Sequence, residues 1–500
     1  MMAMIQVQDL TFAYPSSFDN IFEKVSFQID TDWKLGFIGR NGRGKTTFFN
    51  LLLGKYEYSG KITSSVEFNY FPYPVSDPNK YTYEILEEIC PQAEDWEFLR
   101  EIAYLNVDAE IMYRPFHLLS NGEQTKVLLA ALFLNEGQFL LIDEPTNHLD
   151  IEGRKIVSNY LQKKKGFILI SHDRNFLDGC VDHILSINRA NIEVQSGNYS
   201  SWKLNFDRQQ EYEVAKNERL QKDIGRLKQA AKRSEGWSHK VESSKNGTKI
   251  AGLKPDKGYV GHKAAKMMKR AKTLESRQQK ALEEKSKLLK NVEKTEPLKL
   301  RPLTYHSNDL VTLTDVSIQY DGQKVNQPIS LKIEQGDRIV LNGKNGSGKS
   351  SILKLILGNA IQHTGSMHVS SGLIISYVQQ DTSHLKGQLS DFIQDNGIDE
   401  TLFKSILRKM EFDRIQFEKD ISHYSGGQKK KLLIAKSLCE QAHLYIWDEP
   451  LNFIDIYSRI QIEELIQKFN PTMVFVEHDQ AFQEKIGTKI ISLYPVHKQF

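Results

Sequence analysis

The chain of 500 residues has few cysteines and no long apolar runs. Its three cysteines, Cys90, Cys180 and Cys439, lie far apart and lack the paired spacing of a disulfide framework or a zinc site. No stretch of about 18 apolar residues occurs, and the N-terminal segment lacks the basic and apolar regions of a signal peptide. We therefore expect a protein of the reducing cytoplasm that is neither secreted nor membrane-spanning.

Acidic residues are scarce in the middle of the chain. Residues 201–300 contain 26 Lys and Arg against 13 Asp and Glu, a balance of +13, whereas the whole chain carries only +3. The other 400 residues therefore carry −10, and a basic middle joins two acidic flanks. The segment GHKAAKMMKRAK, residues 261–272, contains five cations and no acid. A charge run of this kind is typical either of a solvated helix face or of a surface that binds nucleic acid.

The sequence repeats itself. Two segments match GxxxxGK[ST], GRNGRGKT at 39–46 and GKNGSGKS at 343–350, and each precedes an apolar run that ends in Asp-Glu-Pro. The offset is nearly constant: 304 residues from Lys45 to Lys349 and 305 from Asp143 to Asp448. The chain is a tandem duplication.

Each copy is predicted to be α/β, because short apolar strands such as FLLID and LYIWD alternate with helical stretches. We expect two P-loop domains at 1–200 and 301–500. The linker between them, 201–300, shows helical periodicity at 202–234 and at 261–292, which predicts a long helical hairpin with residues 235–261 as its tip.

The two Gly-rich loops predict nucleotide binding, because a phosphate chain needs inward N–H groups, a helix N-terminus, a Lys and a hydroxyl that binds Mg²⁺. Magnesium also needs a carboxylate at the end of a neighbouring strand, a role that suits Asp143 and Asp448. The next residues, Glu144 and Glu449, suit the activation of water. The metal ligands expected from these motifs are Thr46, Asp143, Ser350 and Asp448.

Two further segments, LSNGEQ and YSGGQK, open amphipathic helices with Ser-x-x-Glu or Ser-x-x-Gln. This pattern is typical of a capping box, yet the same helix N-terminus can hold a phosphate. The sequence alone leaves both interpretations open.

These motifs, in this order and twice over, resemble the ATP-binding cassette family. The resemblance implies that each signature segment completes the nucleotide site of the other copy within a monomer. It also implies adenine-stacking roles for Tyr14 and Tyr320, which are alternatively ordinary sheet aromatics, and γ-phosphate contacts for His172 and His478. The expected nucleotide-binding residues are Tyr14, Gly39, Asn41, Gly42, Gly44, Lys45, Thr46, Thr47, Ser120, Asn121, Gly122, Glu123, Tyr320, Gly343, Asn345, Gly346, Gly348, Lys349, Ser350, Ser351, Gln380, Ser425, Gly426, Gly427 and Gln428.

The two copies differ at several matching positions. Gln380 fits the metal- and water-contacting glutamine of the family, whereas Tyr73 holds that place in the first copy. Asn121 replaces a signature glycine, and Leu451 and Phe453 stand where the first copy has Thr146 and His148. We therefore expect two unequal sites, with slower hydrolysis at the first.

Two cassettes, a basic helical linker and no membrane segment resemble the ABC-F class of translation factors, and within it the Lsa-type antibiotic resistance proteins. The resemblance implies a 70S ribosome partner, with the linker in the tRNA exit site near 23S rRNA and P-site tRNA. It implies protection from lincosamide, pleuromutilin and streptogramin A antibiotics in the ATP state and release on hydrolysis. The expected RNA-contacting residues are Lys263, Lys266, Lys269, Arg270 and Lys272. A housekeeping ABC-F factor, or the ATPase subunit of a drug exporter, are the alternatives.

Overall fold

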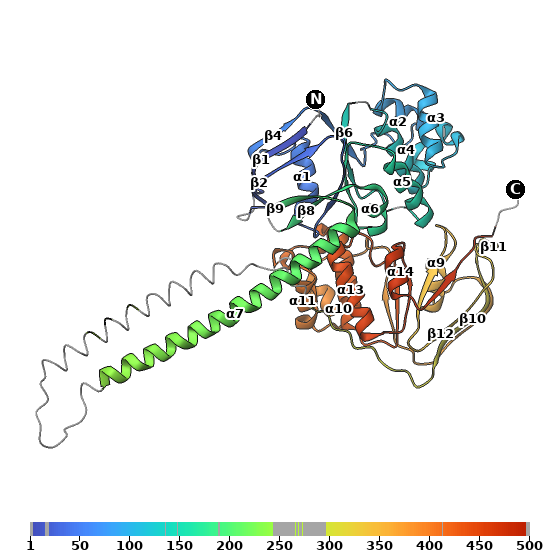
Figure 1. Ribbon diagram of the computed structural model, residues 1–500. Helices are drawn as coiled ribbons and strands as arrows, with labels where there is room; N and C mark the ends of the chain where they lie inside the picture. The colour runs from blue at the N-terminus through green and yellow to red at the C-terminus, as the bar shows by residue number, and fades with distance from the viewer. Residues whose placement is uncertain are drawn as a thin grey trace, which may run out of the picture. The chain divides into compact units, whose positions relative to one another are not determined.

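The computed structural model describes residues 4–15, 20–135, 137–147, 149–188, 191–243, 266, 269, 273, 297–412 and 414–496. The chain forms two compact units. Residues Met1–Trp202 and Thr295–Phe500 make one, and Lys203–Lys294 make the other. In Figure 1 the first copy runs from blue to green and the second from yellow to red.

The first copy contains two sheets. A three-stranded antiparallel sheet has the order β2-β1-β4, with β1 at Met4–Phe12, β2 at Phe22–Asp30 and β4 at Ser59–Ser64. A six-stranded sheet has the order β5-β6-β7-β3-β8-β9 and is parallel except for the β8–β9 pair. Its strands are β3 Lys34–Ile38, β5 Glu67–Phe71, β6 Gln138–Asp143, β7 Phe167–Ile170, β8 His183–Asn188 and β9 Asn191–Ser196.

The second copy repeats this plan. Its antiparallel sheet pairs β10 Asp309–Tyr320 with β11 Gln323–Lys324, β12 Ile329–Glu334 and β14 His363–Val369. Its parallel sheet has the order β15-β16-β17-β13-β18. The strands are β13 Arg338–Asn342, β15 Ile375–Val378, β16 Leu444–Asp448, β17 Met473–Val476 and β18 Lys489–Ser492.

Helices accompany the strands in matching positions. In the first copy they are α1 Lys45–Leu52, α2 Thr82–Ile89, α3 Asp95–Tyr104, α4 Asn121–Leu132, α5 Ile151–Gln162 and α6 Arg174–Cys180, with 3₁₀ turns at Ala109–Tyr113 and Phe116–Leu118. In the second copy they are α9 Lys349–Ile356, α10 Leu389–Asp395, α11 Glu400–Lys409, α12 Gly426–Cys439, α13 Ile456–Phe469 and α14 Gln480–Ile486, with 3₁₀ turns at Arg414–Glu418 and Ile421–His423. The predicted α/β class is confirmed in both copies.

The apolar strands explain why the sheets lie inside. All four residues of β7 and all four of β17 are buried, as expected for parallel strands covered on both faces. In the first copy, Phe37, Phe48 and Phe139 join one core cluster from three different elements. Strands β6 and β16 are packed into these buried sheets, and they end at Asp143 and Asp448.

The basic linker begins with one long helix. Helix α7 spans Tyr199–Ser243, 45 residues, or about 68 Å at 1.5 Å per residue. It continues nine residues beyond Ser234 into the segment that the sequence analysis assigned to the tip, so the predicted tip begins too early. Most of the predicted second helix lies outside the described residues, although Lys266, Lys269 and Thr273 are helical and exposed.

Candidate active sites

Each P-loop joins an inner strand of the larger sheet, β3 or β13, to a helix, α1 or α9. Gly44 and Gly348 cap α1 and α9 in the left-handed region, with φ of 95° and 89°, which glycine adopts without strain. The Lys45 ammonium donates to the carbonyls of Gly39 and Arg40 at 2.7 and 3.1 Å, and Lys349 makes the matching bonds to Gly343 and Lys344 at 2.8 and 3.0 Å. Burial lowers the pKa of both lysines. The two loops therefore hold the same conformation.

The two aspartates that end β6 and β16 meet the hydroxyl groups of the P-loop helices. Thr46 donates to Asp143 at 2.9 Å, and Ser350 bonds Asp448. Burial raises the pKa of both aspartates. Among the described residues, Asp448 Oδ1 is buried and has no hydrogen-bond partner. An unpaired buried carboxylate oxygen is costly unless a cation meets it, so this donor set fits Mg²⁺.

Glu144 and Glu449 follow these aspartates with φ of 51° and 46°, a left-handed conformation that is rare for glutamate. Burial, followed by the charge of Asp143, raises the pKa of Glu144 to about 8. Burial also acts on Glu449, but hydrogen bonds to His478, Gln380 and Asn452 outweigh it and lower the pKa to about 2. The two glutamates therefore differ in charge near neutral pH.

Each glutamate lies beside a histidine. His172 Nε2 and His478 Nε2 are 3.4 Å from Glu144 and Glu449. His172 Nε2 is also 3.0 Å from the amide oxygen of Asn41 in the first P-loop. Burial and then the charge of Lys45 hold the pKa of His172 well below its usual range, so this imidazole is neutral. Each imidazole therefore lies beside the glutamate of its own cassette.

The signature segments form capping boxes in both copies. Ser120 and Glu123 bond each other's backbone N–H at the start of α4, and Ser425 and Gln428 do the same at α12. The capping interpretation is therefore correct. It does not exclude the other interpretation, because Ser120 and Glu123 also line a cavity that contains Lys349.

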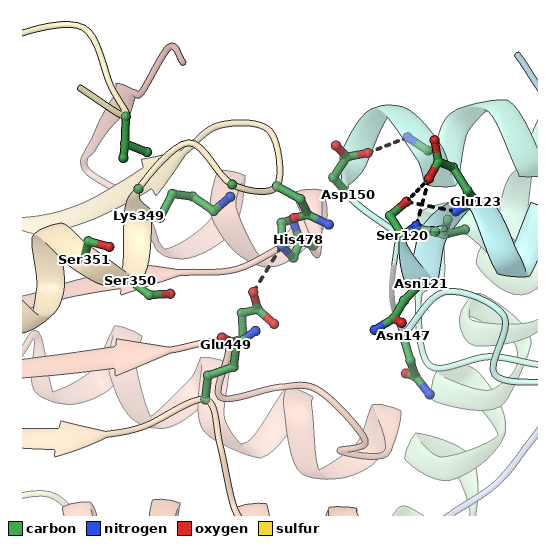
Figure 2. A pocket seen from close by; sticks show the side chains of 18 of the residues that line it. Ser120, Asn121, Glu123, Asn147, Asp150, Lys349, Ser350, Ser351, Glu449 and His478 are labelled. Carbon is green, nitrogen blue, oxygen red and sulfur yellow. Dashed lines mark hydrogen bonds and ion pairs between the residues drawn. The ribbon is translucent and has the colours of Figure 1, made fainter. Parts of the chain in front are cut away.

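A cavity of about 830 Å³ lies between the second P-loop and the first signature segment. In Figure 2 the side chains of Lys349 and Ser350 lie on one side of it, and Ser120 and Asn121 lie on the other. This volume is within the usual range for small-molecule sites. The lining combines both copies: Ser120, Asn121, Gly122, Glu123, Lys126, Asn147, Leu149, Asp150 and Gly153 with Tyr320, Val325, Asn345, Gly346, Gly348, Lys349, Ser350, Ser351, Gln380, Glu449 and His478.

The two tyrosines predicted to stack on adenine occupy matching positions. The Tyr14 hydroxyl is 2.8 Å from Thr47 Oγ1, and the Tyr320 hydroxyl is 2.9 Å from Ser351 Oγ. Tyr14 packs edge-on against Phe12, whereas Tyr320 is 51% exposed and lines the cavity. Each ring is therefore tied to the helix that follows its own P-loop.

The strand register supports the pairing of Tyr73 with Gln380. Phe71 lies opposite Ile142 and Val378 lies opposite Trp447, in both cases one residue before the aspartate. Tyr73 and Gln380 each come two residues later in the chain. Gln380 bonds Glu449, and a phenol cannot offer both an amide oxygen and an amide nitrogen.

At the first site, the P-loop and the second signature segment lie against each other. Asn41 Nδ2 donates to the carbonyl of Phe453 at 2.7 Å. A Cβ on Gly427 would lie 2.5 Å from the same carbonyl oxygen and 2.9 Å from Asn41 Nδ2, so only glycine fits there. The structure thus brings Asn41 of the first P-loop close to Gly427 of the second signature segment.

Sequence reasoning missed residues that lie close to both sites. Asn452 bonds Glu449 at 2.6 Å, and the Lys431 ammonium pairs with Asp455 at 2.9 Å. Their counterparts in the first copy, Asn147, Asp150 and Lys126, line the cavity. The recurrence of Asn and Asp in FLLIDEPTNHLD and LYIWDEPLNFID was a signal that would have found four of these six residues.

Of the predicted RNA-contacting residues, Lys266 and Lys269 are exposed on a helix. Lys263, Arg270 and Lys272 lie outside the described residues. Among the helices of the described part of the chain, none is long and apolar enough to cross a membrane.

A family model described as "ABC transporter" matches residues 22–147 and 326–452, together just over half of the chain. The chain belongs to the ATP-binding cassette family. It is a P-loop ATPase with two tandem cassettes, of the ABC-F type.

Relatives match along nearly the whole chain. The chain is similar to "Ribosome protection protein VmlR" of Bacillus subtilis, with 27% identity over 97% of this chain and 87% of VmlR. It is also similar to "ATP-binding protein Uup" of Buchnera aphidicola, with 26% identity over 98% of this chain and 80% of Uup.

Among solved structures, the archaeal ribosome recycling factor aABCE1, in its complex with the ribosomal stalk protein aP1, aligns with a TM-score of 0.62 and 17% identity. The alignment covers 97% of this chain and 87% of that chain, and it shows the shared tandem-cassette fold.

Proposed function

We propose that this ATPase binds the ribosome at the tRNA exit site in its ATP state and protects the peptidyl-transferase centre from lincosamide, pleuromutilin and streptogramin A antibiotics. The similarity to a ribosome protection protein along 97% of the chain carries this proposal. Helix α7 and the excess of 13 positive charges over residues 201–300 support an RNA partner. Phosphate-rich rRNA, and tRNA in the P site, would be the surfaces that Lys263, Lys266, Lys269, Arg270 and Lys272 contact.

In this proposal, residues of both cassettes bind the nucleotide and its metal ion at each site. Lys45 and Lys349, with the N-termini of α1 and α9, hold the phosphates. Thr46, Asp143, Ser350, Asp448 and Gln380 would hold magnesium. When bound, the magnesium nucleotide supplies the γ-phosphoryl group that hydrolysis transfers to water.

The remaining residues orient water and complete the site. Glu449 is ionised and accepts a hydrogen bond from Asn452, so it is ready to orient a water molecule and accept its proton. His172 and His478 offer a ring nitrogen beside each glutamate. The Ser120–Glu123 and Ser425–Gln428 turns would present the positive N-terminal ends of α4 and α12 to the nucleotide on the opposite cassette, so the closed state depends on both halves.

The test is co-sedimentation with 70S ribosomes. A Glu144→Gln, Glu449→Gln double variant binds ATP without hydrolysing it, so it should remain in the ribosome pellet with ATP and leave it with ADP. The lysine-to-methionine variant of both P-loops, Lys45→Met with Lys349→Met, is the matched control and should stay in the supernatant. Equal distribution of the double glutamine variant with ATP and ADP would contradict the proposal.

A second arm of the test separates drug protection from a housekeeping role. Cell-free translation that is inhibited by lincomycin, tiamulin or virginiamycin M should recover when the native protein and ATP are added. Recovery must be absent with a drug that binds elsewhere on the ribosome, such as spectinomycin. Binding without recovery would leave the housekeeping ABC-F function as the better account.

A further inference from the structure

The first P-loop carries two arginines that both contact one carboxylate of the other cassette. Arg40 Nη1 lies 3.1 Å from Glu411 Oε1, and Arg43 Nη2 lies 2.9 Å from Glu411 Oε2. The Arg40 side chain is only 4% exposed and Glu411 is 34% exposed, so this cluster is partly shielded from water. Shielded pairs with two donors are stronger than isolated surface pairs.

Further contacts of the same loop reach two other segments of the second cassette. The Arg40 guanidinium lies 5.0 Å from the ring centroid of Tyr457. Asn41 donates to the backbone of Phe453. Arg40, Asn41 and Arg43 of one loop thus contact three residues of the second cassette: Glu411, Phe453 and Tyr457. We call this set the first-site clamp.

The duplicated half has different residues at the matching positions. Lys344 and Ser347 correspond to Arg40 and Arg43, with the offset of 304 of the P-loops. Asn106 corresponds to Glu411 with the offset of 305, and both have left-handed backbones, with φ of 52° and 54°. An amide and a hydroxyl cannot form the ion pairs that Arg43 and Glu411 form.

At the second site, the corresponding contact is exposed. Lys344 pairs with Glu152 at 2.9 Å, but the two side chains are 67% and 62% exposed. Ion pairs that are so accessible to water contribute little, because solvent and salt screen them. Glu152 corresponds to Tyr457. The matching positions are therefore joined by a cation–π contact at the first site, Arg40 with Tyr457, and by an exposed ion pair at the second, Lys344 with Glu152.

We propose that Glu411 is a positioning residue that, through Arg40 and Arg43, keeps the cassettes joined at the first nucleotide site while they separate at the second. The clamp consists of protein groups alone, so loss of the γ-phosphate removes none of its contacts. At the matching place of the second site, the Lys344–Glu152 ion pair is exposed and screened by solvent. Cassette opening is then a hinge motion with its axis at the first site. The inference concerns the ATPase cycle and does not depend on ribosome binding.

The experiment measures distances across each site in the full chain without ribosomes. Spin labels are placed on a ketone-bearing amino acid, which leaves the three native cysteines in place. One pair replaces two exposed residues: Lys55, which follows α1 of the first cassette, and Lys419, which precedes the second signature segment. The other replaces Asn359 and Arg114, which are exposed and hold the matching positions across the second site. Both pairs are measured with ADP and with a non-hydrolysable ATP analogue.

In the native chain, the Lys55–Lys419 distance should be the same in both nucleotide states, and the Asn359–Arg114 distance should lengthen with ADP. Glu411→Gln should let the first pair lengthen as well. The Glu411→Gln variant should also release ADP from the first site faster than the native chain, on the order of tenfold. Glu152→Gln is the matched control, because it breaks the exposed pair of the second site and should leave the first-site distance unchanged.

Two outcomes would overturn the proposal. One is a first-site distance in the native chain that lengthens with ADP as much as the second. The other is a Glu411→Gln chain whose first-site distance does not respond to ADP. A thermal melt of each labelled chain shows whether it is folded. Arg43→Gln, which removes the other partner of the pair, must reproduce the Glu411→Gln result.

Discussion

Asn452 donates a hydrogen bond of 2.6 Å to the carboxylate of Glu449, whereas its counterpart Asn147 lines the cavity that contains Lys349. One catalytic glutamate is therefore supported by an amide from its own cassette. The same residue type in the other cassette faces the partner's nucleotide site. The second copy also has Gln380 where the first has Tyr73. From these two differences we predict that the two sites hydrolyse ATP at different rates.

We expect Glu449→Gln to remove more than half of the steady-state ATPase activity and Glu144→Gln to remove less than half. The reason is that Glu449 is ionised near neutral pH, while burial keeps Glu144 largely protonated. Phosphate release from the two single variants is the measurement. Equal losses would show that the sites are equivalent.

Tyr73→Gln should increase hydrolysis at the first site. When it is measured in a Glu449→Gln background, only the first site is active, and a gain of about tenfold corresponds to about 1.4 kcal/mol of transition-state stabilisation. The matched control is Gln380→Tyr in a Glu144→Gln background, which should lower the rate by a similar factor. If both exchanges leave the rate unchanged, this position does not set the difference between the sites.

Lys431→Met should strongly destabilise the second cassette. Lys431 and Asp455 are 5% and 1% exposed and pair at 2.9 Å, so removal of the lysine leaves a buried charge without its cation. Such a change costs about 3–5 kcal/mol. Lys126→Met alters the matching, half-buried lysine of the first cassette and should cost much less. Urea unfolding of both variants gives the comparison, and equal costs would refute the role of the pair.

The protein should lose stability in acid partly through Asp479. Burial alone would raise the pKa of this carboxyl, but Arg459 at 2.9 Å and Arg174 at 3.4 Å outweigh it, and the pKa is lowered. Its unfolded pKa is about 3.9, so its stabilising contribution is complete above that pH and is lost as the pH falls toward the folded value.

Unfolding measured from pH 7 to pH 3 tests this contribution. Asp479→Asn should be less stable than the native chain at pH 7, and its free energy of unfolding should decline less steeply with acid. Asp32→Asn, at an exposed carboxylate, should follow the native curve. A native-like acid slope in Asp479→Asn would rule out this residue as a source of the acid sensitivity.

Lys266→Gln with Lys269→Gln should weaken ribosome binding and reduce its salt dependence. Each lost phosphate contact lowers the slope of log K against log salt by about one unit. Lys24→Gln with Lys61→Gln removes two exposed charges from the β1–β2–β4 sheet and serves as the control. Sedimentation over a salt series provides the slopes, and identical slopes for all three proteins would mean that the two linker lysines do not contact phosphate.

Local patterns predicted the fold, because the P-loops, the apolar strands and the Ser-x-x-Gln turns repeat at a fixed offset. They also located both carboxylate pairs. The clamp residues could not be predicted in this way, since Arg43 and Glu411 are 368 residues apart and no local periodicity links them. The end of α7 was also missed, because residues 235–243 lack the apolar spacing on which helix prediction depends.

The fusion of both cassettes into one polypeptide has a further consequence. A homodimer of identical subunits must repeat any interface contact on both sides, so it cannot favour one side. Here position 411 is acidic while its twin at 106 is an amide. A single substitution can therefore affect one nucleotide site without affecting the other. Covalent duplication thus allows the two ATP molecules to be hydrolysed in a preferred order.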